Sequence, residues 1–366
     1  MENSNTRLLS LDIFRGFTII LMIIVNDPGS WNHVYAPLLH AKWNGLTPTD
    51  YVFPAFLFIL GVSIVLSMTK QIAKGLSKNQ LVKKVLIRSL KIYGVGMFLW
   101  LWPSFDFDVI RWAGVLPRIA IVFLVCALIF LYTKRKTQFV IAALILIFYW
   151  LIMQYLPVPG IGMPDLSVAG KNWANYFDSQ YLPGYLWKKT WDPEGILSTF
   201  PAVVTGLLGM MAGYLLISEI SIKDKLLKLF IMAATLLILG DASQYIMPIN
   251  KSIWSSSFVL MTGGISCLIL ACFVHWVDIK GNALHFQFAR VFGMNAIFSY
   301  ALAGILYTVF YSKKLWGVSL SASFVEELTA IGFAPKLASL LYALFYVIII
   351  WFPTYQLFKR KIYIKL

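Results

Sequence analysis

The groups best suited to chemistry lie in one short polar segment, LLHAKWNGLTPTD, which precedes a long apolar run. It contains His40, one of four histidines in the chain, and it ends at Asp50. An imidazole titrates near neutral pH, so His40 can take a proton from an attacking amine or alcohol. Asn26 and Asp27 close the preceding apolar run, and we expect them to converge with His40 and Asp50. A lone histidine beside an apolar run is also commonly an interfacial polar residue, and the spacing leaves that alternative open.

Other polar residues near the ends of apolar runs are suited to hold a substrate. Thr47 or Thr49 can cap the helix that follows His40, and Asp50 favours the positive end of that helix. A later helix starts within WDPEGILSTF, where carboxylates either suit the helix dipole or hold a cationic or hydroxyl-rich substrate. The candidate substrate-binding residues are Asp27, Trp43, Asn44, Asp50, Asp192 and Glu194.

A second set of polar residues lies within or beside the apolar runs themselves. Arg15 is costly to bury in lipid and has Asp12 three residues earlier, so it is either half of an ion pair or an anchor for an anionic ligand. Arg118, in RWAGVLPRIA, is a similar case. A basic stripe in KKVLIR is typical of membrane topology or of a phosphate site, and the asparagine of GMNAIFSY either joins helices or binds a ligand. The candidate cofactor-binding residues are Arg15, Arg118, Lys84, Arg88 and Asn295.

The elements that position these groups are predicted to be membrane-spanning helices. The chain is 59% hydrophobic and 13% charged, with a mean hydropathy of +0.75, whereas a soluble protein has about 25% charged residues. A span needs about 20 apolar residues. Ten segments qualify, at 9–27, 50–68, 86–103, 114–132, 139–156, 196–217, 227–245, 255–277, 291–311 and 336–357. The pattern predicts an all-α polytopic membrane bundle that forms one domain over residues 1–366, with long loops at 28–49 and 157–195.

The distribution of basic residues predicts the orientation of this bundle. Twenty of the 31 lysines and arginines, Arg7 and Lys365 among them, fall in one set of alternate loops, and nine fall in the other. Because cytoplasmic loops carry the excess, we expect both termini in the cytoplasm and His40 outside, in a multi-pass protein of the cytoplasmic (inner) membrane. The net charge of +15 therefore indicates topology and no nucleic acid. The three cysteines lack metal-ligand spacing, so we expect no metal.

Several segments, in order along nearly the whole chain, carry a family resemblance. They are RLLSLDIFRGFTIILMIIVND, LLHAKWNGLTPTDYVFPAFLFILGVSI, RWAGVLPRIAI, WDPEGILSTFPAVVTGLLGMMAG, INKSIWSSSFVL and GMNAIFSY. They resemble the transmembrane acyltransferases typified by heparan-α-glucosaminide N-acetyltransferase, and the HAxWNGLTxxD stretch is the most specific part. The first predicted span begins near the amino end, so we expect a bacterial form with no preceding luminal domain.

The resemblance implies an activity and two catalytic residues. Members of the family take acetyl groups from acetyl-CoA on the cytosolic side and deliver them to the amino group of a terminal glucosamine on the other side. The catalytic histidine of the family falls on His40, and its assisting asparagine falls on Asn26. Charge and position make Arg15, Arg118 and the basic loops candidates for the phosphates of acetyl-CoA. Spacing does not separate direct transfer from an acetyl-histidine intermediate.

Two other functions fit the same residues. One is a transporter of amino sugars, although few carboxylates lie deep within the predicted spans, which disfavours a proton-coupled carrier. The other is an O-acyltransferase whose acceptor is a hydroxyl of a cell-surface glycan. The expected partners are acetyl-CoA, a glucosamine-bearing sugar or glycan and membrane lipid, and no sequence feature selects or excludes a homodimer.

Overall fold

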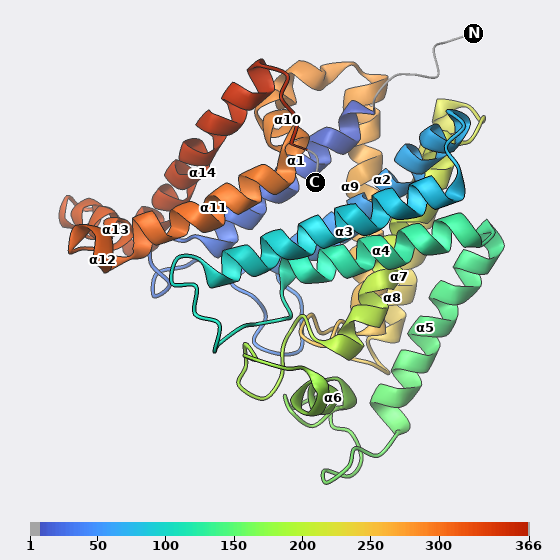
Figure 1. Ribbon diagram of the computed structural model, residues 1–366, viewed down its shortest axis with the longest axis horizontal. Coiled ribbons are helices and arrows are strands. Elements are labelled where there is room, and N and C mark those ends of the chain that lie inside the picture. The colour runs from blue at the N-terminus through green and yellow to red at the C-terminus, as the bar shows by residue number, and fades with distance from the viewer. Residues whose placement is uncertain (1–7, 365–366) are drawn as a thin grey trace. The chain divides into compact units, whose positions relative to one another are not determined.

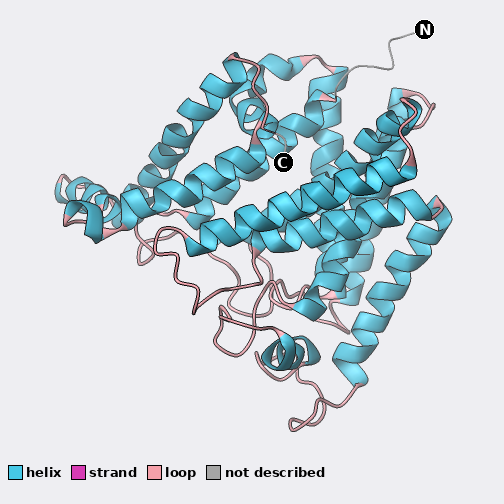
Figure 2. Cartoon of the chain, in the orientation of Figure 1, coloured by secondary structure: helices cyan, strands magenta, loops and turns pink. Residues whose placement is uncertain are grey.

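The computed structural model describes residues 8–364, apart from the side chains of Lys314 and Leu315. Within this range the chain forms helices and no β-strand (Figure 2). This confirms the predicted all-α fold class. Arg7 and Lys365, two of the basic residues counted on the expected cytoplasmic side, lie outside the described residues.

Most of the predicted spans correspond to long apolar helices. In the described part of the chain, eight helical segments are long and apolar enough to cross a membrane. They are Leu9–Asn26 (α1), Pro48–Ala73 (the 3-10 turn η2, Pro48–Tyr51, with α2, Val52–Ala73), Val115–Tyr132 (α4), Arg135–Tyr155 (α5), Ile196–Ile217 (α7), Ile222–Ser243 (α8), Ser256–Ile279 (α9, Ser256–Phe273, with η3, Val274–Ile279) and Pro335–Lys359 (α14).

Two predicted spans differ from a simple apolar helix. The span expected at 291–311 is broken. Asn282–Met294 (η4, Asn282–Phe286, with α10, Gln287–Met294) and α11 (Ala296–Tyr311) meet at a bend of 70°, and they are a ninth segment only if the bent pair crosses as one span. The span expected at 86–103 falls in α3, Lys78–Leu101, whose 24 residues are long enough to cross. Because its amino-terminal half is basic, α3 is not among the eight segments that are apolar enough to cross a membrane. The helix nevertheless packs along α4 (Figure 1).

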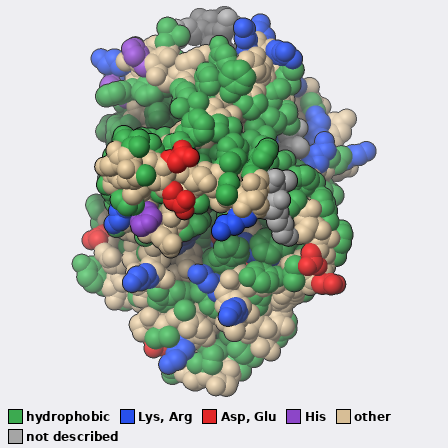
Figure 3. Space-filling view, turned by 90° about the vertical axis from the view of Figure 1, so that its left-hand side faces the viewer, with side chains coloured by type: hydrophobic (Ala, Val, Ile, Leu, Met, Phe, Trp, Pro, Cys, Tyr) green, Lys and Arg blue, Asp and Glu red, His purple; other side chains and the backbone are tan. Residues whose placement is uncertain are grey.

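The remaining helices are short and none is long enough to cross a membrane. They are η1 (Ala36–Leu38), α6 (Trp173–Tyr181), α12 (Lys313–Trp316) and α13 (Leu320–Ala330). The described surface is rich in large apolar side chains, as Figure 3 shows for one face. Leu90, Ile238 and Ile348 are each more than half exposed. Such exposure is unfavourable in water and is suited to lipid contact.

The chain divides into two compact units. Unit 1 consists of Met1–His40, Thr47–Val52 and Cys272–Leu366, and unit 2 consists of Ala41–Leu46 and Phe53–Ala271. The chain thus leaves unit 1 directly after His40 and re-enters it at Thr47. The expectation of one domain over residues 1–366 stays a prediction.

In unit 1, α1 packs closely against α10 through glycines. A Cβ atom at Gly16 would lie 1.8 Å from the carbonyl oxygen of Ala289, and one at Gly293 would lie 1.7 Å from that of Asp12. Both positions therefore exclude any side chain. This contact holds the amino-terminal half of α1, which carries Arg15, against α10.

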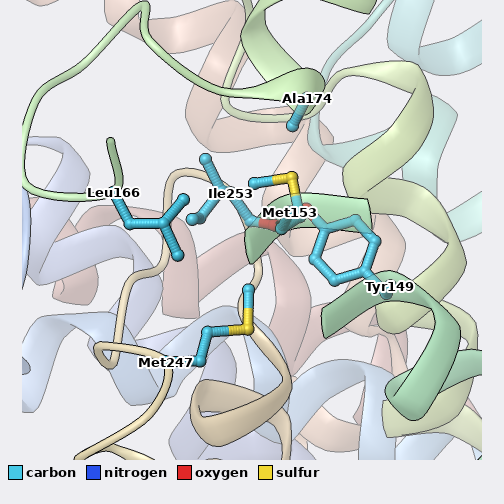
Figure 4. Close-up of a cluster of buried hydrophobic side chains, with 6 residues drawn as sticks. All are labelled: Tyr149, Met153, Leu166, Ala174, Met247 and Ile253. Carbon is cyan, nitrogen blue, oxygen red and sulfur yellow. The ribbon is translucent and has the colours of Figure 1, made fainter. Parts of the chain in front are cut away.

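In unit 2, α7 packs against α4, α5, α6 and α8. Glycines again allow a close helix contact, because a Cβ at Gly61 of α2 would lie 1.9 Å from the carbonyl oxygen of Gly206 in α7. A buried apolar cluster, shown in Figure 4, joins α5 and α6 to the loops beside them. Its members are Tyr149, Met153, Leu166, Ala174, Met247 and Ile253.

Candidate active site

His40 is paired with a buried carboxyl group. Its Nδ1 lies 2.7 Å from Oδ1 of Asp50, and its side chain is 47% exposed whereas that of Asp50 is 1% exposed. The other oxygen of Asp50 accepts a hydrogen bond from the backbone N–H of Thr47 at 3.0 Å and lies 2.9 Å from Thr47 Oγ1. An ionised carboxylate can only accept, so we assign the neutral imidazole's proton to Nδ1. Its lone pair is then on Nε2.

The local sequence explains why this pair forms. Thr47 precedes the short turn η2, Pro48 occupies the first position of the turn, and Asp50 reaches back to the N–H of Thr47 as in a capping box. This confirms Thr47 as the capping residue. Thr47 Oγ1 also lies 2.7 Å from the carbonyl oxygen of Leu39, and Thr49 Oγ1 donates to that of Pro37 at 3.1 Å. The turn therefore fixes both Asp50 and the backbone that leads into His40.

Asn26 and Asp27 lie at the carboxyl end of α1, in the same unit as His40. Asn26 is the last residue of the helix and is exposed. Asp27 caps the helix and is only 7% exposed, and burial raises the pKa of its carboxyl group to about 8. Helix α1 also packs against η2, the turn that carries Asp50. A direct role for Asn26 in the chemistry stays a prediction.

Trp43 and Asn44 are two candidate substrate-binding residues, and the polar groups of their side chains form hydrogen bonds to other parts of the chain. Trp43 Nε1 and Asn44 Nδ2 both donate to the carbonyl oxygen of Leu166, at 2.9 and 3.0 Å. Asn44 Oδ1 accepts from Asn250 Nδ2 at 2.9 Å. Asn250 was not among the candidates, although its place in the resembling segment INKSIWSSSFVL was a usable signal. In unit 2 these contacts tie residues 41–46 to the 157–195 loop and to the α8–α9 connection.

Asp192 and Glu194 share one arginine. Arg111 donates from Nε and Nη2 to the two oxygens of Asp192, each at 2.7 Å, and Nη2 lies 2.6 Å from Glu194 Oε2. Its guanidinium also lies 5.8 Å and 5.0 Å from the ring centroids of Trp100 and Trp187. Arg111 was not among the candidate site residues, because its partners lie about eighty residues away in the chain.

These contacts change the acidity of both partners. Burial by itself raises the pKa of Asp192, but the hydrogen bond and charge of Arg111 outweigh it and hold the pKa below its usual value. Burial lowers the pKa of Arg111, and the two carboxylates more than reverse that effect. The two expected substrate carboxylates are therefore already paired with one cation of the chain.

Arg118 is fully buried and only partly satisfied. Its Nη2 donates to the carbonyl oxygen of Gly195 at 3.1 Å and to Ser198 Oγ, and its guanidinium lies 5.1 Å from the Trp254 ring centroid. Its Nε and Nη1 have no hydrogen-bond partner among the described residues. Unsatisfied buried donors are uncommon in folded proteins. These two N–H groups can serve a ligand oxygen, and Arg118 is in unit 2, at the amino end of α4.

The other candidate cofactor-binding residues also have protein partners. Arg15 Nη1 lies 3.2 Å from Asp12 Oδ1 and 3.2 Å from the carbonyl oxygen of Gly293, so the expected pairing with Asp12 is present, and a role of Arg15 in cofactor binding stays a prediction. The Arg15 side chain is still 20% exposed. Lys84 Nζ donates to a glutamine at 3.3 Å, and the guanidinium of Arg88 lies 4.8 Å from a phenylalanine ring. Both are exposed on α3, in unit 2.

Asn295 occupies the break between α10 and α11. Its Nδ2 donates to the carbonyl oxygen of Ile362 at 3.1 Å, and its Oδ1 accepts from the N–H of Ile364 at 2.8 Å. The amide thus pins the carboxyl-terminal segment to the helix break, as expected of a residue that joins elements. Its role in cofactor binding stays a prediction. Across residues 8–364, no group of three or more His, Cys, Asp or Glu side chains could hold a metal ion.

Comparisons with known proteins agree with the sequence resemblance. The family model described as heparan-alpha-glucosaminide N-acetyltransferase, catalytic, matches residues 7–251, a region that contains His40 and Asp50. The human protein named heparan-alpha-glucosaminide N-acetyltransferase is 30% identical over 418 residues, which cover 98% of this chain and 60% of the human protein. The mouse protein of the same name is 29% identical over 423 residues, covering 100% of this chain and 61% of the mouse protein. The chain spans about 60% of the length of these relatives, and it belongs to the heparan-α-glucosaminide N-acetyltransferase catalytic family.

Proposed function

We propose that this protein is a transmembrane N-acetyltransferase. It moves an acetyl group from cytoplasmic acetyl-CoA to the amino group of a glucosamine-type sugar on the outer side of the membrane. The observation that carries the proposal is the pairing of exposed His40 with buried Asp50, within the region that the family model matches. The name of the human and mouse relatives supports the reaction and the sugar.

The His40–Asp50 pair is arranged for proton transfer. With Nδ1–H donated to Asp50, Nε2 carries the lone pair and can act as a general base. As the amine nitrogen bonds to the thioester carbonyl carbon, Nε2 takes a proton from the nitrogen, and Asp50 stabilises the imidazolium. The C–S bond then breaks and the imidazolium returns the proton to the departing thiolate. Attack by Nε2 itself, through an acetyl-histidine, uses the same geometry and remains the alternative.

Asn26 is proposed to stabilise the oxyanion. Its side chain is exposed at the end of α1, so its amide N–H is available to a developing negative charge. Removing one such donor in other enzymes costs about 3 kcal/mol of transition-state stabilisation. Asn26→Ala is therefore expected to lower kcat more than it changes the KM for either substrate.

Arg15 is proposed to help hold the phosphates of acetyl-CoA. It lies on the same helix as Asn26, eleven residues earlier, which corresponds to about 16 Å along α1. A phosphate group is too costly to carry through hydrocarbon. The nucleotide part therefore stays near the Arg15 end of α1, and the pantetheine arm carries the thioester towards Asn26 and His40.

The experiment compares two histidine variants of the purified protein. Thiol release from acetyl-CoA is measured with glucosamine, and the mass of the product is determined. His40→Ala is expected to lower kcat by a factor of about 10² to 10⁴, the usual contribution of a general base. The matched control is His33→Ala, the same substitution at another exposed histidine of unit 1, and this variant should keep the wild-type activity.

The same experiment separates the alternatives. Undiminished turnover by His40→Ala would remove the catalytic assignment. Acetyl esters in the product, with no amide, would show O-acyl transfer. Uptake of labelled glucosamine into vesicles without acetyl-CoA, together with no thiol release, would show a transporter.

A further inference from the structure

Asp27 is a buried carboxyl group that the described residues leave without a charged partner. It is 7% exposed, and among residues 8–364 no lysine, arginine or histidine pairs with it and no side chain hydrogen-bonds its carboxyl oxygens. A carboxyl group taken out of water without a partner is costly. The cost is understandable if a ligand supplies the partner.

Four tyrosines from two helices, called here the tyrosine wall, lie within electrostatic range of this carboxyl group. Tyr307 and Tyr311 come from α11, and Tyr342 and Tyr346 come from α14; Asp27 acts electrostatically on all four. The rings of Tyr307 and Tyr311 are stacked with their centroids 4.2 Å apart, and those of Tyr342 and Tyr346 are stacked with their centroids 6.1 Å apart. The Tyr311 ring meets that of Tyr342 edge-on at 5.8 Å.

The wall is fixed to the chain around Asp27 and reaches the surface. The Tyr311 hydroxyl donates to the carbonyl oxygen of Pro28 at 2.9 Å. Gly29, two residues after Asp27, packs so closely on Tyr342 that a Cβ there would lie 2.8 Å from the tyrosine Cβ. Tyr307 is 39% exposed, and Trp31 beside it is 55% exposed. A ligand can therefore approach along this aromatic edge.

A lone carboxylate beside the electron-rich faces of aromatic rings is suited to an ammonium group. A glucosamine differs from a neutral hexose by having that group. Resting on the function proposed above, we propose that Asp27 and the tyrosine wall dock the ammonium group of the acceptor and that Asp27 takes its first proton.

The proton balance of this step is closed. Because burial raises the pKa of Asp27 to about 8, the free carboxyl group is mostly protonated at neutral pH and releases one proton to water when the ammonium docks. The ammonium then gives one proton to the carboxylate, which restores the carboxylic acid. The neutral amine forms the N–C bond, passes its second proton to His40 Nε2, and that proton leaves on the CoA thiol. One proton is released to water per acetyl group transferred.

The first test uses Asp27→Asn, with Glu326→Gln as the matched control. Glu326 is an exposed carboxylate of the same unit, and its variant should behave as the wild type. Asp27→Asn is expected to raise the KM for glucosamine at least tenfold and to leave the KM for acetyl-CoA unchanged within twofold. An unchanged KM for glucosamine would overturn the proposal.

The second test needs no variant. Calorimetric titration of the wild-type protein with glucosamine at pH 6.5, in two buffers of different ionisation enthalpy, measures the protons released on binding. Release approaching one proton per glucosamine is expected, and glucose should release none. Glucosamine binding without proton release would overturn the docking site.

The two proposals fail in different ways. If the wild-type protein transfers no acetyl group to glucosamine, the proposed function fails. If it transfers the acetyl group and Asp27→Asn does so equally well at every pH, the function stands and only the docking site fails.

Discussion

Asp50→Asn changes one charge and almost no volume, and the structure indicates what it does to His40. The backbone N–H of Thr47 donates to Oδ2 of Asp50 at 3.0 Å and cannot act as an acceptor. An asparagine must therefore turn its carbonyl oxygen towards Thr47 and its NH₂ towards His40 Nδ1. That arrangement requires a lone pair on Nδ1 and moves the ring proton to Nε2. The nitrogen proposed as the base is then already protonated.

The expected loss is large because the wrong tautomer cannot take a proton. In a serine protease, the equivalent aspartate-to-asparagine change lowers kcat by about 10⁴-fold with the geometry intact. We expect Asp50→Asn to lower kcat for thiol release by about 10³-fold or more, with a KM for acetyl-CoA close to that of the wild type. The double variant His40→Ala/Asp50→Asn should be no slower than His40→Ala, since both changes remove one function.

A matched control and a direct readout make this test decisive. Asp165→Asn alters a carboxylate of intermediate exposure in the 157–195 loop and should retain full activity. Nitrogen NMR of labelled histidine should report the proton on Nδ1 in the wild type and on Nε2 in Asp50→Asn. If Asp50→Asn retains more than a tenth of the wild-type kcat, Asp50 does not orient the base.

Four further changes test other parts of the structure. Gly293→Ala places a Cβ 1.7 Å from the carbonyl oxygen of Asp12 and should cost about 1–3 kcal/mol or more of stability, seen as a lower melting temperature. The control Gly94→Ala meets open space and should keep the wild-type melting temperature. Equal melting temperatures for the two variants would contradict the α1–α10 packing. The pKa of Asp27 is about 8 in the folded chain against an ordinary 3.8, so the folded state binds an extra proton between these two pH values. The stability of the wild type should therefore fall by about 1.4 kcal/mol per pH unit as the pH rises through that range. The melting temperature of Asp27→Asn should lack this fall, and the same pH dependence in both proteins would argue against burial of the charge. Arg111→Met leaves Asp192 and Glu194 without their cation and should cost about 3–5 kcal/mol, with faster proteolysis of the 157–195 loop; unchanged cleavage would show that the ion pair does not hold it. Arg15→Ala should weaken CoA binding about tenfold, within the range for one lost charged hydrogen bond, and unaltered binding would exclude Arg15 from the phosphate site.

Hydropathy predicts the helices well because each span is decided locally. Segments such as 9–27 and 196–217 are apolar over a full membrane thickness, and the structure has α1 and α7 there. The 70° break at Asn295 was not predicted, since the apolar pattern continues through it. At the break, Asn295 donates a hydrogen bond to the backbone of Ile362 and accepts one from the backbone of Ile364, and both residues are nearly seventy positions away.

The candidate site shows the same division between local and distant causes. The capping turn around Thr47 was predictable, because its residues are within four positions of one another. The contact of Asp50 with His40 was not, since the sequence indicated only that the two converge. Arg111 was missed as the partner of Asp192 and Glu194, because nothing in a single sequence pairs charges that lie so far apart. Unit membership is also a tertiary property: Trp43 and Asn44 fall in unit 2, although His40 is in unit 1.

Sealed vesicles that contain the purified protein test the central claim most directly. Acetyl-CoA is enclosed, glucosamine is supplied only outside, and the position of each product is determined. The proposed reaction predicts N-acetylglucosamine outside and free CoA thiol inside, with both products formed at least about a hundredfold more slowly by His40→Ala. Acetylation only when both substrates are on the same side of the membrane would contradict it.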